Sequence, residues 1–498
     1  SMEDLSAVSV NISNNLIVDG TTTLQDISLA NIDISNNLTV DGTTTLSGDV
    51  TILNSLDVCG TFNVSSLTLE DLSLANIDIS NNLTVEGTTS LTGSVSITGS
   101  LDVSSISYTH NNPDNINKIS MANITDVQLG KDISDSSEYF GNTISLSQDG
   151  KIISIGGQEV AKVYHWNNDT SWVQLGQDLS NSGQIQSTSL SSNGKYVAFG
   201  QYEHRTVKVY ELSNNNLWEQ IGVDLSNGNN INFGNSLSLS DGSSSDIRIA
   251  VGASNHTDGQ IPHVIVYEWN DTSWVTVGSQ INHQGYDTSN NQFGYSVSLA
   301  SNGNLVAIGA PKFSNNNNGL VKIYEYRDLS WEQIGQDISS GETSIFPHQY
   351  FGITVSLSDV SRVAVADGRQ YGKVRIYEYN DTSWVQLGDS IDLSNITISD
   401  ITNTESRRNR VSLSSDGTRI SVGNLNGGAN EPGNVKVYEY NNSSWNEIAN
   451  IVDYRDISNE FGYSTSISRN GHKVASVAPS ENQANVNSFV RISEILKK

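Results

Sequence analysis

The side chains best suited to chemistry in this sequence are aromatic rings, histidines and arginines, in segments that differ from one repeat to the next. Aromatic rings stack on sugars and fill interface pockets, and arginine donates bidentate hydrogen bonds. These residues therefore predict a surface that binds a glycan or a protein, although unconstrained loops would contain them as well. The candidate binding residues are Tyr202, His204, Arg205, His283, Tyr286, His348, Tyr350, Arg369, Tyr371 and Arg407.

Patterns typical of catalysis or metal binding are absent from the sequence. It contains no nucleophile elbow, His-Glu-x-x-His segment, phosphate loop or paired-carboxylate motif. His256 and His263 lie in variable segments, but no two histidines have the spacing of metal ligands on one strand or helix. Cys59 is the only cysteine, which excludes an intrachain disulfide. We therefore expect no catalytic residue, metal or cofactor, and we do not expect an enzyme.

A glutamate recurs at one position of the repeat and could suggest a ring of catalytic acids. A residue present in almost every repeat is better explained by a role in the repeat itself. We expect these carboxylates to accept hydrogen bonds from neighbours, and we expect the recurring tryptophans to pack the repeats together. The glutamates are Glu211, Glu268, Glu325, Glu378 and Glu439, and the tryptophans are Trp172, Trp218, Trp274, Trp331, Trp384 and Trp445.

The repeat itself predicts four short strands. Its clearest copy runs from Phe293-Gly294 through Ser296–Leu299, Val306–Ala310 and Val321–Tyr326 to Ser330-Trp331. Apolar residues alternate within these runs, and Gly, Asn and Asp separate them, as in the blades of a β-propeller. Seven units are expected, beginning near Phe140, Ser187, Phe233, Phe293, Phe351, Arg410 and Phe461.

The two ends of the repeat region predict a closed ring. The last unit stops after its third strand and lacks the Ser-Trp strand. The missing strand lies at the front, because Val127–Ile133 repeats Val173–Leu179 almost letter for letter. We expect this early segment to pair beside Val490–Ile495, so that residues 124–498 form an all-β, seven-bladed propeller closed by its N-terminal strand.

The repeat resembles the FG-GAP family of propellers, to which integrin head domains belong. Phe293-Gly294 and Gly309-Ala310-Pro311 carry both halves of the family motif. Members often hold calcium in an Asp-rich loop between the first two strands. The corresponding turns here, such as Ser147–Gly150, offer one carboxylate each, short of the six to eight oxygen ligands that calcium prefers. The resemblance therefore implies the fold without the metal.

Residues 1–108 form a different, repetitive β-shaft, and 109–123 read as a linker. Apolar pairs such as Leu38/Val40 and Leu56/Val58 recur about every five to six residues. One slender ribbon buries too little apolar surface to fold alone. Either three chains share an axis as a trimeric β-helical fibre, or one chain coils into a β-solenoid of about 22 residues per turn. We favour the trimer, because the step is shorter than a solenoid coil. The shaft also resembles those of bacteriophage and large-virus fibres, which are commonly trimers.

Composition excludes several partners. The formal net charge of −28 opposes binding to nucleic acid and to anionic lipid surfaces. No stretch has the length of a membrane-spanning helix and no signal peptide is visible, so we expect no membrane insertion.

These features together predict a viral or phage attachment protein at a virion surface or in another extracellular setting. Its shaft would form a homotrimer, and its head would bind a cell-surface glycan or protein receptor. One alternative is a secreted or cell-surface adhesin or matrix protein of a bacterium or alga. Another alternative is a propeller enzyme acting on polysaccharide.

Overall fold

The computed structural model describes the strands within residues 5–103 and the region 126–496 with fifteen gaps. The gaps are 136, 138, 168–169, 202–203, 229–231, 242–246, 255–260, 284–290, 314–317, 342–349, 369–371, 393–410, 425–431, 454–460 and 479–487. The chain divides into two compact units, Ser1–Asn123 and Ile124–Lys498. Each unit is described by itself.

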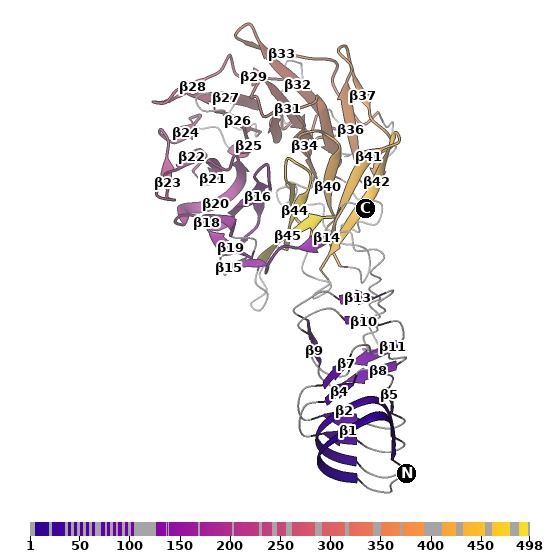
Figure 1. Cartoon of the computed structure of the whole chain (residues 1–498). Helices are drawn as coiled ribbons and strands as arrows, with labels where there is room; N and C mark the ends of the chain where they lie inside the picture. Colours follow the sequence, from indigo (N-terminus) through magenta and orange to yellow (C-terminus); the bar gives the residue numbers. More distant parts are fainter. Residues whose placement is uncertain are drawn as a thin grey trace. The chain divides into compact units, whose positions relative to one another are not determined.

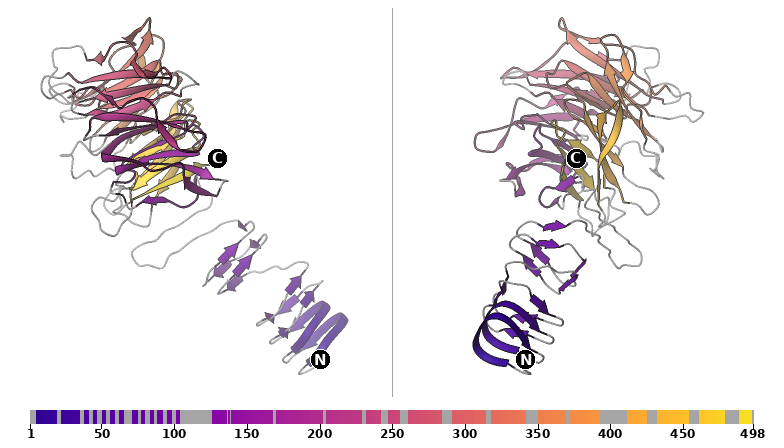
Figure 2. Two further views of the ribbon diagram at one scale, coloured as in Figure 1. Left: turned by 90° about the vertical axis from the view of Figure 1, so that its left-hand side faces the viewer. Right: turned by 45° about the vertical axis from the view of Figure 1, so that its right-hand side comes forward.

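The N-terminal unit is built from parallel strands (Figures 1 and 2). Two long strands, β1 (Leu5–Val18) and β2 (Thr22–Ile34), pair with each other. Three successive parts of β2 then pair with β3 (Leu38–Val40), β4 (Thr44–Leu46) and β5 (Val50–Ile52). The later strands are β6 (Leu56–Val58), β7 (Phe62–Val64), β8 (Asp71–Leu74), β9 (Ile77–Ile79), β10 (Leu83–Val85), β11 (Thr88–Leu91), β12 (Val95–Ile97) and β13 (Leu101–Val103).

The register of these pairs shows that three short strands make one coil. Leu38 pairs with Leu56 and Thr44 with Phe62, each 18 positions further along the same chain. Three steps of five to six residues add up to such a coil. A step of five to six residues is therefore compatible with a solenoid, contrary to the reason given for favouring the trimer, and the coil is shorter than the expected 22 residues. The trimer stays a prediction.

The second unit is a β-propeller of seven four-stranded antiparallel blades (Figure 1). Its first strands follow one another in a closed circle of contacts, from β43 to β16 and back to β43, and so surround a central channel.

In chain order, blades 1 to 3 are β16 (Thr143–Leu146), β17 (Ile152–Gly156), β18 (Gln158–Asn167) and β19 (Ser171–Gln174); β20 (Leu179–Leu190), β21 (Tyr196–Gln201), β22 (Thr206–Leu212) and β23 (Trp218–Gln220); and β25 (Phe233–Leu239), β26 (Arg248–Ala253), β27 (His263–Trp269) and β28 (Trp274–Thr276). Blades 4 to 6 are β30 (Ser296–Leu299), β31 (Leu305–Ala310), β32 (Leu320–Arg327) and β33 (Ser330–Gln333); β34 (Thr354–Leu357), β35 (Arg362–Ala366), β36 (Lys373–Tyr379) and β37 (Trp384–Gln386); and β39 (Val411–Leu413), β40 (Arg419–Asn424), β41 (Asn434–Asn441) and β42 (Ser444–Val452). Short strands β24 (Leu225–Ser226), β29 (Ile281–Asn282) and β38 (Ile391–Asp392) extend the third strands of blades 2, 3 and 5.

Blade 7 confirms the predicted closure. From the channel outwards, the blade consists of β43 (Thr465–Ile467), β44 (Lys473–Ala478) and β45 (Ser488–Ile495). The N-terminal strands β14 (Asp126–Gln128) and β15 (Ile133–Asp135) together take the outermost position. β14 and β15 pair antiparallel with β45, and Leu129 donates its backbone N–H to the carbonyl of Ile492 at 2.8 Å. We call residues 126–135 the latch, because they connect the beginning of the propeller to its end.

A buried ion pair fastens the latch. The Arg491 guanidinium donates to both oxygens of Asp132, at 3.0 and 3.1 Å, and to Asp453 at 3.2 Å. It also lies against the rings of Phe461 and Phe489, 5.3 and 5.5 Å from their centroids. Blade 2 holds a counterpart of this pair, Lys208 and Asp224, but the two charges lie 3.8 Å apart and their side chains are 25% and 42% exposed.

Serines join neighbouring blades around the channel. In each first strand a serine hydroxyl accepts the backbone N–H of a Leu or Ile in the next blade, at 2.9 to 3.1 Å. The seventh of these bonds, from Leu146 to Ser466, joins blade 7 to blade 1. The accepting serines are Ser145, Ser189, Ser238, Ser298, Ser356, Ser412 and Ser466.

The Phe-Gly motif fits the packing between blades. Phe140, Phe233, Phe293, Phe351 and Phe461 are at most 1% exposed. In four of these five motifs, the carbonyl of the following glycine lies against a glycine of the preceding blade. The approach is so close that a Cβ on Gly309 would lie 2.1 Å from the Gly352 oxygen. Hydrophobic clusters combine side chains of successive blades, as where Val264 and Val266 pack with Phe293 and Val297.

The predicted packing role of the tryptophans is confirmed. Each of the six indole N–H groups donates to a backbone carbonyl at the end of the fourth strand of the preceding blade, at 2.8 to 3.0 Å. Trp172 of blade 1 uses the carbonyl of Leu129, so the latch is bonded on both of its sides. Burial of these rings therefore joins the blades at their outer edge as the serines do at the channel.

The latch yields a stability prediction. Asp132→Asn should lower the free energy of unfolding by roughly 2–3 kcal/mol, because it leaves a buried guanidinium with one carboxylate instead of two. Denaturant unfolding of residues 124–498 measures the change. Asp224→Asn is the matched control and should cost less than about 1 kcal/mol, because its pair is exposed. Equal losses in the two variants would show that the latch depends on strand pairing alone.

Candidate functional site

Antiparallel strands divide the propeller into two faces. Connections that enter a first strand, or that join a second strand to a third, lie at one end of every blade, which we call the loop face. Turns between strands 1 and 2, and between strands 3 and 4, lie at the other end, which we call the turn face. Those predicted binding residues that the structure describes, His204, Arg205, His283 and Tyr350, belong to connections of the loop face.

The turn face is occupied by contacts that support the fold. The turns between strands 1 and 2 bond to one another in a complete circle, beginning with the N–H of Gln148 to the carbonyl of Ser192 and ending with Asn470 to Gln148. The bonds between them join Ser192 to Asp241, Asp241 to Ser301, Ser301 to Asp359, Asp359 to Ser415, and Ser415 to Arg469, at 2.8 to 3.2 Å.

Arg469 crosses the channel at this face. It belongs to blade 7, yet its guanidinium contacts Ser301 of blade 4, and pairs with Asp241 of blade 3 at 3.4 Å and Asp359 of blade 5 at 3.7 Å. In a ring of seven, blades 3 and 4 lie opposite blade 7, so the side chain must pass over the axis. Arg469 therefore obstructs this end of the channel.

Three of the five recurring glutamates accept hydrogen bonds from a neighbouring arginine, as predicted. Arg248, Arg362 and Arg419 each donate Nε to the glutamate of the adjacent third strand, at 2.7 to 2.8 Å. The same arginines donate Nη1 to the carbonyl of a turn glycine in the next blade, at 3.1 to 3.2 Å. These three carboxylates thus hold arginines that join one blade to the next.

Four of the ten predicted binding residues lie within the described part of the chain. His204 is exposed, and Arg205 and Tyr350 are half-buried, all on the loop face. Tyr202, Tyr286, His348, Arg369, Tyr371 and Arg407 lie outside the described residues.

The expected exposure of His283 is wrong. It is 8% exposed, and its ring packs edge-on against Phe313 at 4.7 Å and near Phe293 at 6.2 Å. The preceding residues Ile281–Asn282 pair as β29 with β27, which draws the segment into the blade. His283 therefore belongs to the core of blades 3 and 4.

His263 is a second buried histidine of the loop face. It is 1% exposed, and its Nδ1 lies 2.7 Å from the carbonyl of Ile261. A carbonyl can only accept, so Nδ1 carries the proton and Nε2 accepts from the Asn227 amide at 2.5 Å. Burial lowers the pKa of His263 below its usual 6.5, which keeps the ring neutral. It thus connects two loop-face segments of neighbouring blades.

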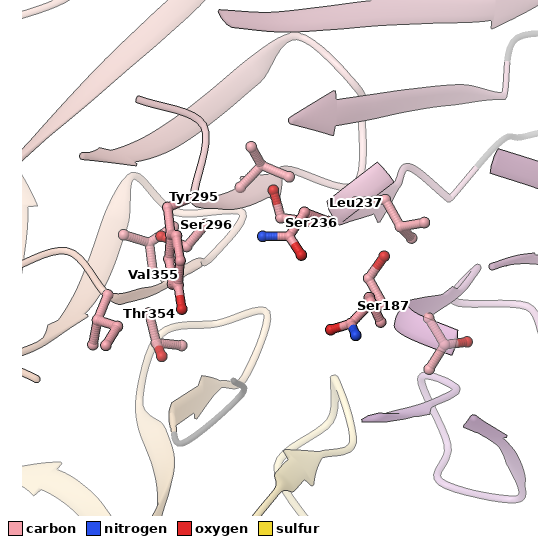
Figure 3. Close-up of a pocket in the computed structure, with 12 residues that line it drawn as sticks. Ser187, Ser236, Leu237, Tyr295, Ser296, Thr354 and Val355 are labelled. Atoms are coloured by element: carbon pink, nitrogen blue, oxygen red, sulfur yellow. The ribbon is translucent and has the colours of Figure 1, made fainter. Parts of the chain in front are cut away.

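A polar cavity opens at the loop-face end of the channel (Figure 3). The first strands of blades 2 to 5 each contribute three successive residues, Gln186–Thr188, Asn235–Leu237, Tyr295–Val297 and Ile353–Val355. None of the twelve is charged, and the cavity volume is about 50 Å³. This volume suits a few waters or a small chemical group and is far below the roughly 300–1,000 Å³ of a typical small-molecule site.

None of the residues that line this cavity was among the predicted binding residues. The sequence feature that could have indicated the cavity is the residue after each Phe-Gly, which varies and is always followed by Ser or Thr. This residue is Asn142, Asn235, Tyr295, Ile353 or Tyr463. The repeat predicted a regular strand at these positions. Their variation from blade to blade distinguishes the strands that line the channel.

The described residues contain no group of three His, Cys, Asp or Glu side chains arranged to hold a metal ion. Within the same part of the chain, no helix is long and apolar enough to cross a membrane. What the loop face offers is hydrogen bonding and ring stacking, from uncharged side chains in the cavity and from His204, Arg205 and Tyr350 around it.

Comparison by sequence finds no matching protein family and no matching curated protein. Among solved structures, that of U3-55K is 11% identical with a TM-score of 0.49, over 73% of this chain and 98% of its own. The WD40 repeats of RRP9 are 10% identical with a TM-score of 0.49, over 74% and 100%. Hydrazine synthase of Kuenenia stuttgartiensis is 11% identical with a TM-score of 0.44, over 69% and 94%. The propeller assignment rests on the blade topology, and the FG-GAP resemblance stays a prediction.

The buried His263 yields a pH prediction. Its neutral form is favoured in the folded protein, so unfolding takes up a proton below pH 6.5. Its contribution to stability is complete above that pH and is lost, by up to about 1.4 kcal/mol per pH unit, as the pH falls towards the folded pKa. Denaturant unfolding at pH 7.5 and 5.5 should show a smaller loss for His263→Gln than for the unaltered protein. The same loss in both would mean that the ring is not desolvated.

Proposed function

We propose that this chain is an attachment protein, of the kind carried on viral or phage fibres, whose propeller head binds a receptor through its loop face. The asymmetry between the two faces carries the proposal. Turn-face side chains such as Arg248, Arg362 and Arg469 are engaged in bonds between blades. Variation without loss of the fold is therefore easiest on the loop face, where His204, Arg205 and Tyr350 lie.

The N-terminal unit supports the same proposal. A parallel coil that repeats every 16 to 18 residues lengthens by adding identical turns, as a projecting shaft requires. The latch begins directly after this unit, so the head would be carried by a chain segment that is itself bonded into blade 7. The Phe-Gly and Gly-Ala-Pro motif further supports an FG-GAP-like head.

Cell binding tests the proposed face. The whole chain, labelled with a fluorophore, should bind a subset of cells in a panel, and His204→Ala or Tyr350→Ala should weaken that binding by about tenfold. Leu329→Asn is the control, because Leu329 is 81% exposed on the turn face and Asn tolerates its positive φ of 67°.

Three outcomes would count against the proposal. Equal binding by all variants would remove the loop face from consideration. Binding to matrix rather than to host cells would support the alternative of an adhesin. Release of cleaved sugar from the cells would support the polysaccharide-acting enzyme.

Molar mass tests the proposed trimer. We expect light scattering to give three chains for residues 1–498 and one chain for residues 124–498, because the propeller closes its own ring and needs no partner. A single chain in both cases would contradict the trimer and leave the N-terminal unit as a coil complete in one chain.

A further inference from the structure

The cavity at the loop-face end of the channel contains a hydroxyl that the fold does not use. Ser187, Ser236 and Ser296 donate their hydroxyls to the carbonyls of Gly234, Gly294 and Gly352 in the next blade, at 2.7 to 2.8 Å. Thr354 occupies the same strand position in blade 5 and is 4% exposed. Its Oγ1 has no hydrogen-bond partner among the described residues, and Figure 3 shows it on the cavity wall. An unpaired hydroxyl at this depth costs about 1–3 kcal/mol unless a molecule from outside supplies a partner.

We call this cavity, lined by the first strands of blades 2 to 5, the well. Arg469 and the circle of turn-face hydrogen bonds obstruct the far end of the channel. Among the described residues, these contacts leave the loop face as the approach to Thr354. This is the face on which the proposed receptor-binding residues His204 and Tyr350 lie.

The chemistry of the well selects an uncharged ligand. Its polar groups are the amides of Gln186 and Asn235 and several hydroxyls, including that of Tyr295, which can each donate and accept. No lining side chain carries a charge. A carboxylate, sulfate or ammonium group would lose its hydration there without a counter-charge, at a cost of several kcal/mol.

We propose that this well receives the hydroxyl groups of a neutral carbohydrate, one without sialic acid, sulfate or phosphate. The inference rests on the proposed attachment function and names the receptor class for it. With a volume of about 50 Å³, the well admits one hydroxyl-bearing tip of the sugar, such as a hydroxymethyl group. The remainder of the glycan lies outside, against the loop face.

A glycan array carrying neutral, sialylated and sulfated glycans tests the proposal with the whole chain and two variants. Thr354→Val removes the hydroxyl at constant shape, and Ser464→Ala is the matched control. Ser464 holds the same strand position in blade 7, is fully buried, and has a hydroxyl that is also without a partner in the described structure, but it does not line the well. Neither change removes a protein hydrogen bond, so neither should lower stability in denaturant unfolding.

We expect binding to neutral glycans, weakened about tenfold by Thr354→Val and unchanged by Ser464→Ala. Selection of sialylated or sulfated glycans would overturn the inference, and so would unchanged binding by Thr354→Val. In both cases the attachment function would stand. Cell binding without any glycan binding would likewise overturn the inference and point to a protein receptor. Loss of both cell and glycan binding would overturn the attachment proposal as well.

Discussion

The closed circle of hydrogen bonds between serines and backbone amides is the constraint on which the propeller depends. One such bond contributes about 1 kcal/mol, but each also sets the offset between two neighbouring first strands. Seven equal offsets bring Ser466 back to Leu146. The two ends of the chain must then meet, which is why blade 7 takes its outer strands from the latch and why a buried arginine holds them there.

The glycine pairs explain how the blades come close enough for these bonds. At four blade boundaries a second-strand glycine faces the carbonyl of the next Phe-Gly, with room for no Cβ, as for Gly200, Gly252, Gly309 and Gly423. At the closing boundary Val477 takes the corresponding place and lies against Gly141. The ring therefore tolerates different packing at the closing boundary, where the latch adds its own ion pair and tryptophan contact.

Much of the fold could be predicted from the sequence, because almost every blade repeats the same strand and turn motifs. The Ser-Trp strand missing from the last unit and found at Val127–Ile133 was enough to predict the closure. The site was harder. His283 has the polar neighbours of a loop, yet two residues of pairing with β27 bury it. Thr354 looks like any strand threonine, and only the lack of a hydrogen-bond partner among the described residues distinguishes it. Such features depend on contacts between blades that no local pattern records.

The negative net charge of the chain and the uncharged lining of the well both bear on the ligand proposed above. With a net charge of −28, the chain repels anionic glycans before any contact forms, although salt screens this repulsion beyond about 8 Å. The fold then confines its central arginine to the turn face, where Asp241 and Asp359 neutralise it. No cationic side chain therefore lines the well to offset the repulsion. An acidic chain with an uncharged well is consistent with a neutral ligand at both long and short range, and the weak affinity of so small a contact is what several heads acting together would strengthen.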